Sequence, residues 1–215
     1  MKNEKISMLQ MLLTVVFVSS LMISNIIVGK QIEVFGMTVP SAVFIFPIIY
    51  ILSDVFSEVY GYRWSRMTCY LAFCMNLFMV IVFALVIVAP FPEYFGNQSA
   101  FEIVLGNTPK ILLASSLGFI AGDFVNDRVF RAMKRKHPDS HERFGFRAIV
   151  SSLFGEVTDS LIFMPIAFIG VLPMEAIIQM FVVQVSFKVL YEIIALPLNK
   201  CVVRKVSDLE GGWVR

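Results

Sequence analysis

The chain has 215 residues, of which 58% are hydrophobic and only 16% are charged, and its formal net charge is +2. Soluble domains hold about 45–50% apolar and about 25% charged residues, so this composition and a mean hydropathy of +0.79 exclude a soluble globular protein. We therefore predict an all-α integral membrane protein in which residues 1–215 form a single transmembrane domain.

Six apolar segments are long enough to cross a bilayer as helices, because a spanning helix needs about 20 apolar residues. The fourth of them is the shortest and the most polar. The amphipathic stretch 91–110 is expected to lie on the membrane surface as a loop or a short helix. In chain order, the approximate bounds of the six predicted helices are 8–29, 39–59, 67–89, 111–126, 148–172 and 176–198.

The distribution of lysine and arginine sets the expected orientation. With the N-terminus in the cytoplasm, the inner segments hold almost all of these residues, whereas the outer loops hold only Lys30 and Lys110. Cytoplasmic loops of membrane proteins carry an excess of positive charge. The pattern therefore predicts six membrane-spanning helices with both termini in the cytoplasm. We expect the protein to be located in the plasma membrane or the inner membrane of the cell.

The basic stretch 128–147, "RVFRAMKRKHPDSHERFGFR", is expected to be the loop between the fourth and fifth helices. Its charge is compatible with nucleic acid, but a cytoplasmic anchor that touches lipid headgroups is the simpler interpretation. His137 and His141 lie four residues apart, and Pro138 breaks the helix that would place them on one face. We expect no nucleic-acid partner and no metal site here.

Several ionisable residues lie inside the predicted helices, where each costs about 2.5–3.5 kcal/mol. Pairs spaced by three or four residues share one face of a helix. Glu58 and the acids of the fourth helix lie near the cytoplasmic edge, so capping or pairing with arginine is an equal alternative for them. These residues are Asp54 and Glu58, Asp123 and Asp127, Glu156 and Asp159, and Lys188 and Glu192.

The deeper residues fall in one layer of the inner half of the bilayer when each helix rises 1.5 Å per residue. That layer holds Asp54, Glu156, Asp159, Lys188 and Glu192. One lysine cannot balance four carboxylates, so we expect a single polar cavity in which Lys188 neutralises some of them. The first and sixth helices add the amides of Asn25 and Gln184 to the candidate site. Prolines are expected to interrupt the second, fifth and sixth helices at Pro47, Pro165 and Pro197.

Carboxylates, amides and aromatic rings together suit a flat heterocycle. A carboxylate can accept the N–H and the amino group of a guanine-like edge as a pair, while an aromatic side chain stacks on the ring. Phe46, Phe56 and Phe187 are candidates for that stacking. A simple cation would also fit the acids, so these residues alone leave the substrate open.

The segments "SDVFSEVYGY", "GDFVND", "FRAIVSSLFGEVTDSLIF" and "FKVLYEIIALP" resemble the signature blocks of the queuosine precursor transporter family, which is also labelled as vitamin-uptake transporters. The resemblance covers nearly the whole chain. It implies uptake of 7-deazaguanines such as 7-cyano-7-deazaguanine, 7-aminomethyl-7-deazaguanine or queuine for tRNA modification. Some members carry a basic residue at the position of Glu58. The family-type positions are Asn25, Asp54, Glu58, Glu156, Asp159, Lys188 and Glu192.

Two other functions are alternatives to a carrier that works alone. A substrate-binding subunit that cooperates with an ATP-hydrolysing module would need a partner, because the chain has no GxxxxGK stretch. A membrane enzyme is disfavoured because the chain has no HExxH motif and no nucleophile elbow. We therefore predict a transporter that binds a purine-like molecule and needs no cofactor. The sequence leaves the oligomeric state open, and a homo-oligomer is possible.

Overall fold

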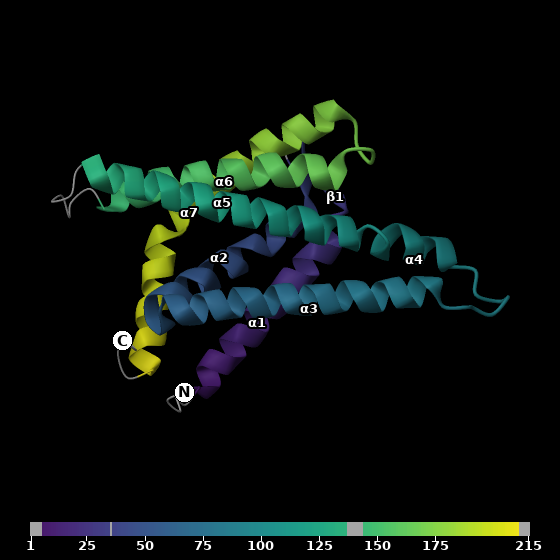
Figure 1. Cartoon of the computed structure of the whole chain (residues 1–215), viewed down its shortest axis with the longest axis horizontal. Helices are drawn as coiled ribbons and strands as arrows, with labels where there is room; N and C mark the ends of the chain where they lie inside the picture. The colour runs from purple at the N-terminus through teal and green to yellow at the C-terminus, as the bar shows by residue number, and fades with distance from the viewer. Residues whose placement is uncertain (1–5, 35, 137–143, 211–215) are drawn as a thin grey trace. The chain divides into compact units, whose positions relative to one another are not determined.

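The computed structural model describes residues 6–34, 36–136 and 144–210, and it is mostly helical (Figure 1). Two short strands, β1 (Gln31–Val34) and β2 (Met37–Pro40), form a two-stranded sheet. A 3₁₀ turn, η1 (Ser41–Phe44), and a π-helical turn, η2 (Phe56–Tyr60), flank the second helix. The helices are α1 (Met8–Ile27), α2 (Phe46–Val55), α3 (Tyr62–Val88), α4 (Gln98–Leu105), α5 (Thr108–Lys136), α6 (Phe144–Phe168) and α7 (Met174–Leu209).

Within the described residues, five helical stretches are long and apolar enough to cross a membrane. They correspond to the first, third, fourth, fifth and sixth of the predicted helices, so the expected helical membrane architecture is confirmed in this coarser form. Six spans and cytoplasmic termini stay predictions. The five stretches are Met8–Ile27, Tyr62–Val88, Gln98–Met133, Val150–Phe168 and Met174–Tyr191.

The second predicted helix, 39–59, begins later than expected, at Phe46. Its first residues belong instead to β2 and η1, because short apolar runs fit strand and helix equally well. Pro47 lies in the first turn of α2, where its missing N–H has no partner to lose. The expectation that Pro47 interrupts a helix is therefore wrong, since this proline starts one. The helix continues through η2 and stops at Gly61, whose φ is 83°.

Other boundaries also differ from expectation. The fourth helix, predicted over 111–126, extends from Thr108 to Lys136, so the first part of the predicted basic loop is helical. The sixth, predicted over 176–198, continues to Leu209 with Pro197 inside it, and Pro165 lies inside α6. The stretch 91–110 contains the short helix α4, which is one of the two predicted forms, whereas its location on the membrane surface stays a prediction. His137 and His141 lie outside the described residues.

The chain divides into two compact units, which are described separately. The first unit, called unit 1, contains Met1–Ile32, Pro40–Thr108 and Tyr191–Arg215. The second, called unit 2, contains Glu33–Val39 and Pro109–Leu190. The predicted single domain stays a prediction.

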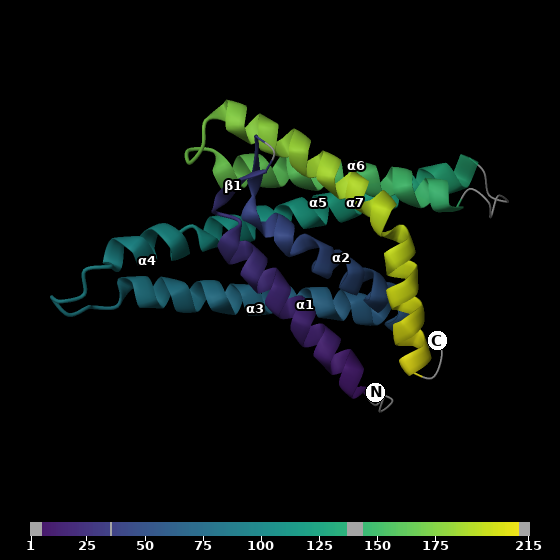
Figure 2. The same ribbon diagram turned by 180° about the vertical axis from the view of Figure 1, so that it is seen from behind.

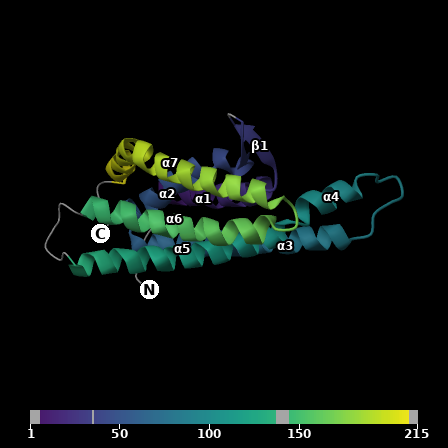
Figure 3. The same ribbon diagram turned by 90° about the horizontal axis from the view of Figure 1, so that it is seen from above.

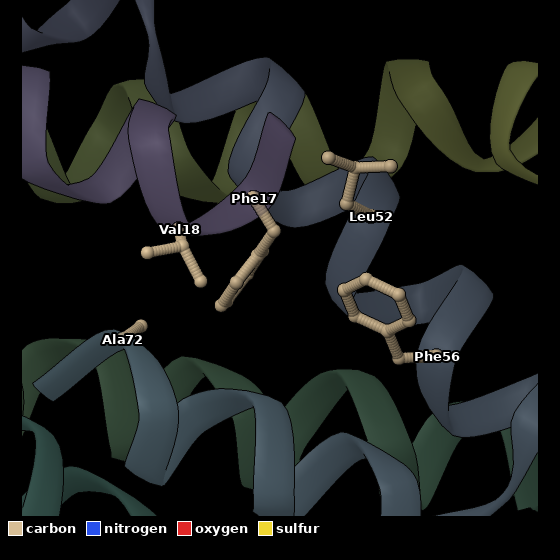
Figure 4. Packing of buried hydrophobic residues seen from close by; sticks show 5 residues of the cluster. All are labelled: Phe17, Val18, Leu52, Phe56 and Ala72. Carbon is tan, nitrogen blue, oxygen red and sulfur yellow. The ribbon is translucent and has the colours of Figure 1, made fainter. Parts of the chain in front are cut away.

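Unit 1 is built around an apolar cluster that joins its first helices. Figure 4 shows Phe17 and Val18 of α1 facing Leu52, Phe56 and Ala72. The rings of Phe17 and Phe56 meet edge to face, with centroids 5.5 Å apart, which is a favourable aromatic geometry. Figures 1 and 2, which are opposite views, both show that α1 crosses α3 obliquely.

The C-terminal part of α7 packs against α2 within unit 1. Val55 and Val59 form a buried cluster with Val203 and Val206. Nearer the chain end, the hydroxyl groups of Ser7 and Tyr60 both donate to Glu210 Oε1, at 2.5 and 3.1 Å. Residues later in α2 and η2 contact residues later in α7, so α2 and this part of α7 run in the same direction.

Unit 2 is an antiparallel arrangement of α5, α6 and the first part of α7 (Figure 3). Near the start of α5, Lys110 Nζ donates to the carbonyl oxygen of Ile169 at 2.7 Å, directly after the end of α6. A cation there is favourable, because the carbonyl groups of a helix C-terminus carry partial negative charge. A short turn with Gly170 at φ 82° then leads into α7.

Candidate functional site

The structure joins two of the predicted site residues in unit 2. Lys188 Nζ donates to Asp159 Oδ2 at 2.8 Å, and the two side chains are 6% and 28% exposed. The two residues belong to neighbouring helices that run antiparallel, and the packing of α6 against the first part of α7 brings their side chains together. The sequence-based expectation that Lys188 neutralises an acid of this layer agrees with this ion pair.

Three glycines hold the backbone of α5 against the acidic face of α6. A Cβ atom on Gly118 would lie 2.6 Å from Asp159 Oδ1, and one on Gly122 would lie 2.8 Å from the carbonyl oxygen of Gly155. Membrane helices approach this closely where small residues recur every fourth position. The sequence reasoning missed these glycines, although the spacing in "GFIAG", residues 118–122, is a signal that could have identified them.

Two further polar residues lie on the faces that carry the ion pair. Glu156, one turn before Asp159 on α6, is half-buried. Gln184, one turn before Lys188 on α7, is 7% exposed, and its Oε1 has no hydrogen-bond partner among the described residues. Buried polar atoms normally have a partner, so this amide oxygen is available to a ligand. We call Glu156, Asp159, Gln184 and Lys188 the ion-pair cluster.

A different predicted acid, Asp54, lies in unit 1 beside aromatic rings. Its carboxylate is exposed, and Asn199 Nδ2 donates to Oδ2 at 2.6 Å. Tyr50, one turn earlier on α2, has its ring centroid 5.6 Å from that of Tyr191 and 6.0 Å from that of Phe46.

The hydroxyl of Tyr191 donates to the carbonyl oxygen of Pro47 at 3.1 Å, and this bond fixes its ring beside α2. We call Phe46, Tyr50, Asp54, Tyr191 and Asn199 the carboxylate–aromatic cluster. The sequence reasoning considered Phe46 and Asp54 but missed the other three. Tyr191 and Asn199 lie far from Asp54 in the chain, and Tyr50 was not distinguished from the other aromatic residues of its segment.

The remaining predicted residues have other surroundings. Glu58 is exposed in the π-helical turn, one turn after Asp54. Phe56, considered as a stacking residue, is 1% exposed and belongs to the apolar core. Glu192 belongs to α7, and its side chain is outside the part of the chain that the structure describes.

Asn25 has a buried partner on α3. Its Nδ2 donates to Asn76 Oδ1 at 2.7 Å, and Asn76 Nδ2 donates in turn to the carbonyl oxygen of Ala72 at 2.9 Å. The amide of Asn25 therefore joins two helices of unit 1. A single cavity that unites all predicted residues stays a prediction, because they are distributed over both units.

Comparison with known proteins identifies the family. The family model described as "Putative vitamin uptake transporter" matches residues 40–202. The chain belongs to this family. It is also similar to a protein of Bacillus subtilis (strain 168) named "Probable queuosine precursor transporter", with 29% identity over 177 residues that cover 81% of this chain and 76% of the relative. No solved structure matches the chain.

Membership of this uptake transporter family confirms the resemblance seen in the sequence. Together with the five candidate membrane-spanning helices, it makes the chain a multi-pass membrane protein of a transporter family. The matched residues include every member of the ion-pair cluster and of the carboxylate–aromatic cluster, whereas Asn25 precedes them.

Proposed function

We propose that this uptake transporter imports a queuosine precursor of the 7-deazaguanine class across the cell membrane. Its family and the name of its Bacillus subtilis relative support a substrate of this kind. In the proposed topology the chain crosses the membrane six times and keeps both termini in the cytoplasm.

The carboxylate–aromatic cluster is the observation that carries the proposal. A guanine-like edge presents two adjacent N–H donors, which one exposed carboxylate can accept together. Asp54 has such a carboxylate, and Asn199 holds one of its oxygens at 2.6 Å. The rings of Tyr50 and Tyr191 lie beside it, and a flat base gains about 1–3 kcal/mol by stacking on an aromatic side chain.

The ion-pair cluster has a second role in this proposal. Lys188 holds Asp159 in place, and Glu156 and the amide oxygen of Gln184 supply acceptors for the N–H groups of the passing base. We therefore expect substitution of Asp159 or Glu156 to impair the movement of the substrate.

A complementation assay tests the substrate. Cells that lack both precursor synthesis and their own importer would be given 7-cyano-7-deazaguanine, 7-aminomethyl-7-deazaguanine or queuine, and queuosine in tRNA would be measured. We expect queuosine in cells that produce this chain and none with an empty vector. Equal amounts in both, with the protein shown in the membrane by immunoblot, would contradict the proposal.

A site variant links the same assay to the proposed residues. Asp54→Asn removes the paired acceptor and should abolish queuosine formation at low external precursor. Glu93→Gln removes an exposed carboxylate outside both clusters and should leave it unchanged. Transport of labelled base by the purified chain in liposomes then tests whether it works without an ATP-hydrolysing partner.

A further inference from the structure

The side-chain amide of Asn199 has one polar atom in a hydrogen bond and one without a partner. Its Nδ2 donates to Asp54 Oδ2 at 2.6 Å. Its Oδ1 is buried and has no hydrogen-bond partner in the part of the chain that the structure describes. Buried polar atoms normally have a partner, because an unpaired one destabilises the fold. This oxygen is therefore an acceptor for which the described residues supply no donor.

The bond to Asp54 determines which way this amide points. A rotation by about 180° would exchange the oxygen and the nitrogen of the amide, but it would place Oδ1 against a carboxylate oxygen, and neither of these atoms can donate. The covalent lengths of the amide group and the hydrogen bond of 2.6 Å together limit the separation of Asn199 Oδ1 from Asp54 Oδ2 to about 5 Å. Two acceptors thus lie close together, one charged and one neutral.

Two acceptors at this separation suit a single amino group. The two N–H bonds of an amino group diverge by about 120°, so its two acceptors lie about 5 Å apart when each N···O distance is about 2.9 Å. An oxygen of an ionised carboxylate has two lone pairs. Asp54 Oδ2 can therefore accept a hydrogen from Asn199 and one from a ligand at the same time, while Asn199 Oδ1 accepts the second hydrogen of the same amino group.

We propose that Asn199 selects bases with an unsubstituted amino group, by accepting the amino hydrogen that points away from Asp54. Asp54 accepts the other amino hydrogen and the neighbouring ring N–H. This inference rests on the proposed function, since it takes a guanine-type base as the ligand. It gives Asn199 a direct contact with the substrate in addition to its bond with Asp54. The rival acceptor is Glu58, which is exposed one turn after Asp54.

The experiment compares two ligands that differ by one methyl group. The full chain, purified in a neutral detergent, is titrated calorimetrically with 7-cyano-7-deazaguanine and with its 2-methylamino analogue. The analogue keeps one amino hydrogen for Asp54 and has a methyl group in place of the other. The wild type should bind the analogue at least about tenfold more weakly, because a site built around a hydrogen bond rejects a ligand that lacks the donor. Asn199→Ala should bind both ligands within about threefold of each other, because it removes the acceptor and leaves room for the methyl group.

The ratio of the two affinities separates a direct contact from a positioning role. If Asn199 only held Asp54 in place, Asn199→Ala would weaken both ligands equally and leave the ratio unchanged, which would overturn the proposal. A ratio that falls in Glu58→Ala but not in Asn199→Ala would also overturn it. The matched control is Asn97→Ala, because Asn97 is exposed and its side chain makes no capping hydrogen bond, and its ratio should equal that of the wild type.

The wild type alone distinguishes this inference from the proposed function. Binding of 7-cyano-7-deazaguanine and of its methylated analogue with equal affinity would overturn the role of Asn199 and leave the proposed function intact. Binding of neither ligand would contradict the proposed function and this inference with it. If Asn199→Ala does not fold, Asn199→Ser takes its place in the comparison, with the same expected loss of discrimination.

Discussion

The backbone of Gly118 lies so close to Asp159 that a single methyl group would collide with the carboxylate of the ion pair. The distance from the position of that methyl carbon to Asp159 Oδ1 is 2.6 Å. Asp159 is therefore held from two sides, by the ammonium group of Lys188 and by the surface of α5. Its position depends on a residue that contributes no side chain.

Substitution of this glycine should impair transport through Asp159. Gly118→Ala forces the carboxylate away from Lys188, and overpacking of this kind costs about 1–3 kcal/mol. We expect uptake of labelled base to fall about tenfold or more. Gly96→Ala is the matched control, because a Cβ atom at Gly96 meets nothing within 4 Å, and uptake by this variant should equal that of the wild type.

The stability of the protein should depend on having both Asp159 and Lys188, or neither of them. Asp159→Asn removes the carboxylate that lies 2.8 Å from the ammonium group of Lys188, whose side chain is 6% exposed, and removing one partner of a buried pair costs about 3–5 kcal/mol. We expect a lower Tm for the purified protein in detergent. Adding Lys188→Met should recover most of the Tm but not the uptake, whereas a double variant that transports normally would argue against a role for these residues.

The hydrogen bond between Asn199 and Asp54 should matter for substrate affinity more than for stability. Asn199→Ala removes the donor at 2.6 Å from Asp54 Oδ2, while the carboxylate remains exposed to water. Hydrogen bonds to charged groups contribute about 1.5–3 kcal/mol, so the KM for uptake should rise about tenfold with little change in Tm. Asn199→Asp, which replaces the donor with a second acid, should be at least as impaired.

The buried amide pair of α1 and α3 should contribute to stability alone. Asn25 and Asn76 are 7% and 0% exposed and share a hydrogen bond of 2.7 Å. Hydrogen bonds between membrane helices contribute about 0.6 kcal/mol on average and about 1.7 kcal/mol at most. A double-mutant cycle with Asn25→Ala and Asn76→Ala, followed by unfolding, should give a coupling energy in that range. If Asn25→Ala abolished uptake without changing stability, Asn25 would instead bind substrate.

The apolar segments could be predicted because the favourable free energy of moving about 20 apolar side chains into a bilayer outweighs the helix propensities of single residues. The residues at which the helices begin and end could not be predicted in this way. Val39–Phe44 is as apolar as the helix that follows it, and only Pro47 marks the start of α2. An interruption at Pro47 was the prediction because proline fits both the first turn of a helix and a break inside one, and the apolar pattern is the same in the two cases.

The candidate acids could be predicted because a charged residue in an apolar run is conspicuous. Their partners could not, since Asn199 pairs with a residue 145 positions earlier in the chain and no local spacing signals that contact. Lys188 with Asp159 is a closer case, because a short turn joins the two antiparallel helices that carry them, and an ion pair of Lys188 with an acid of this layer was expected although its partner was not specified. Tyr50 and Tyr191 are two of six tyrosines, and nothing in their local sequence distinguished them from the others.

The hairpin of α6 and α7 also has a consequence for biosynthesis. Asp159 and Lys188 would each oppose insertion if their helices left the translocon one at a time, by about 2.5–3.5 kcal/mol. Because the two charges are already in contact at 2.8 Å across one turn, a preassembled hairpin delivers a neutral pair to the lipid. The ribosome must therefore finish about residue 190 before the first of these helices can settle in the bilayer at low cost.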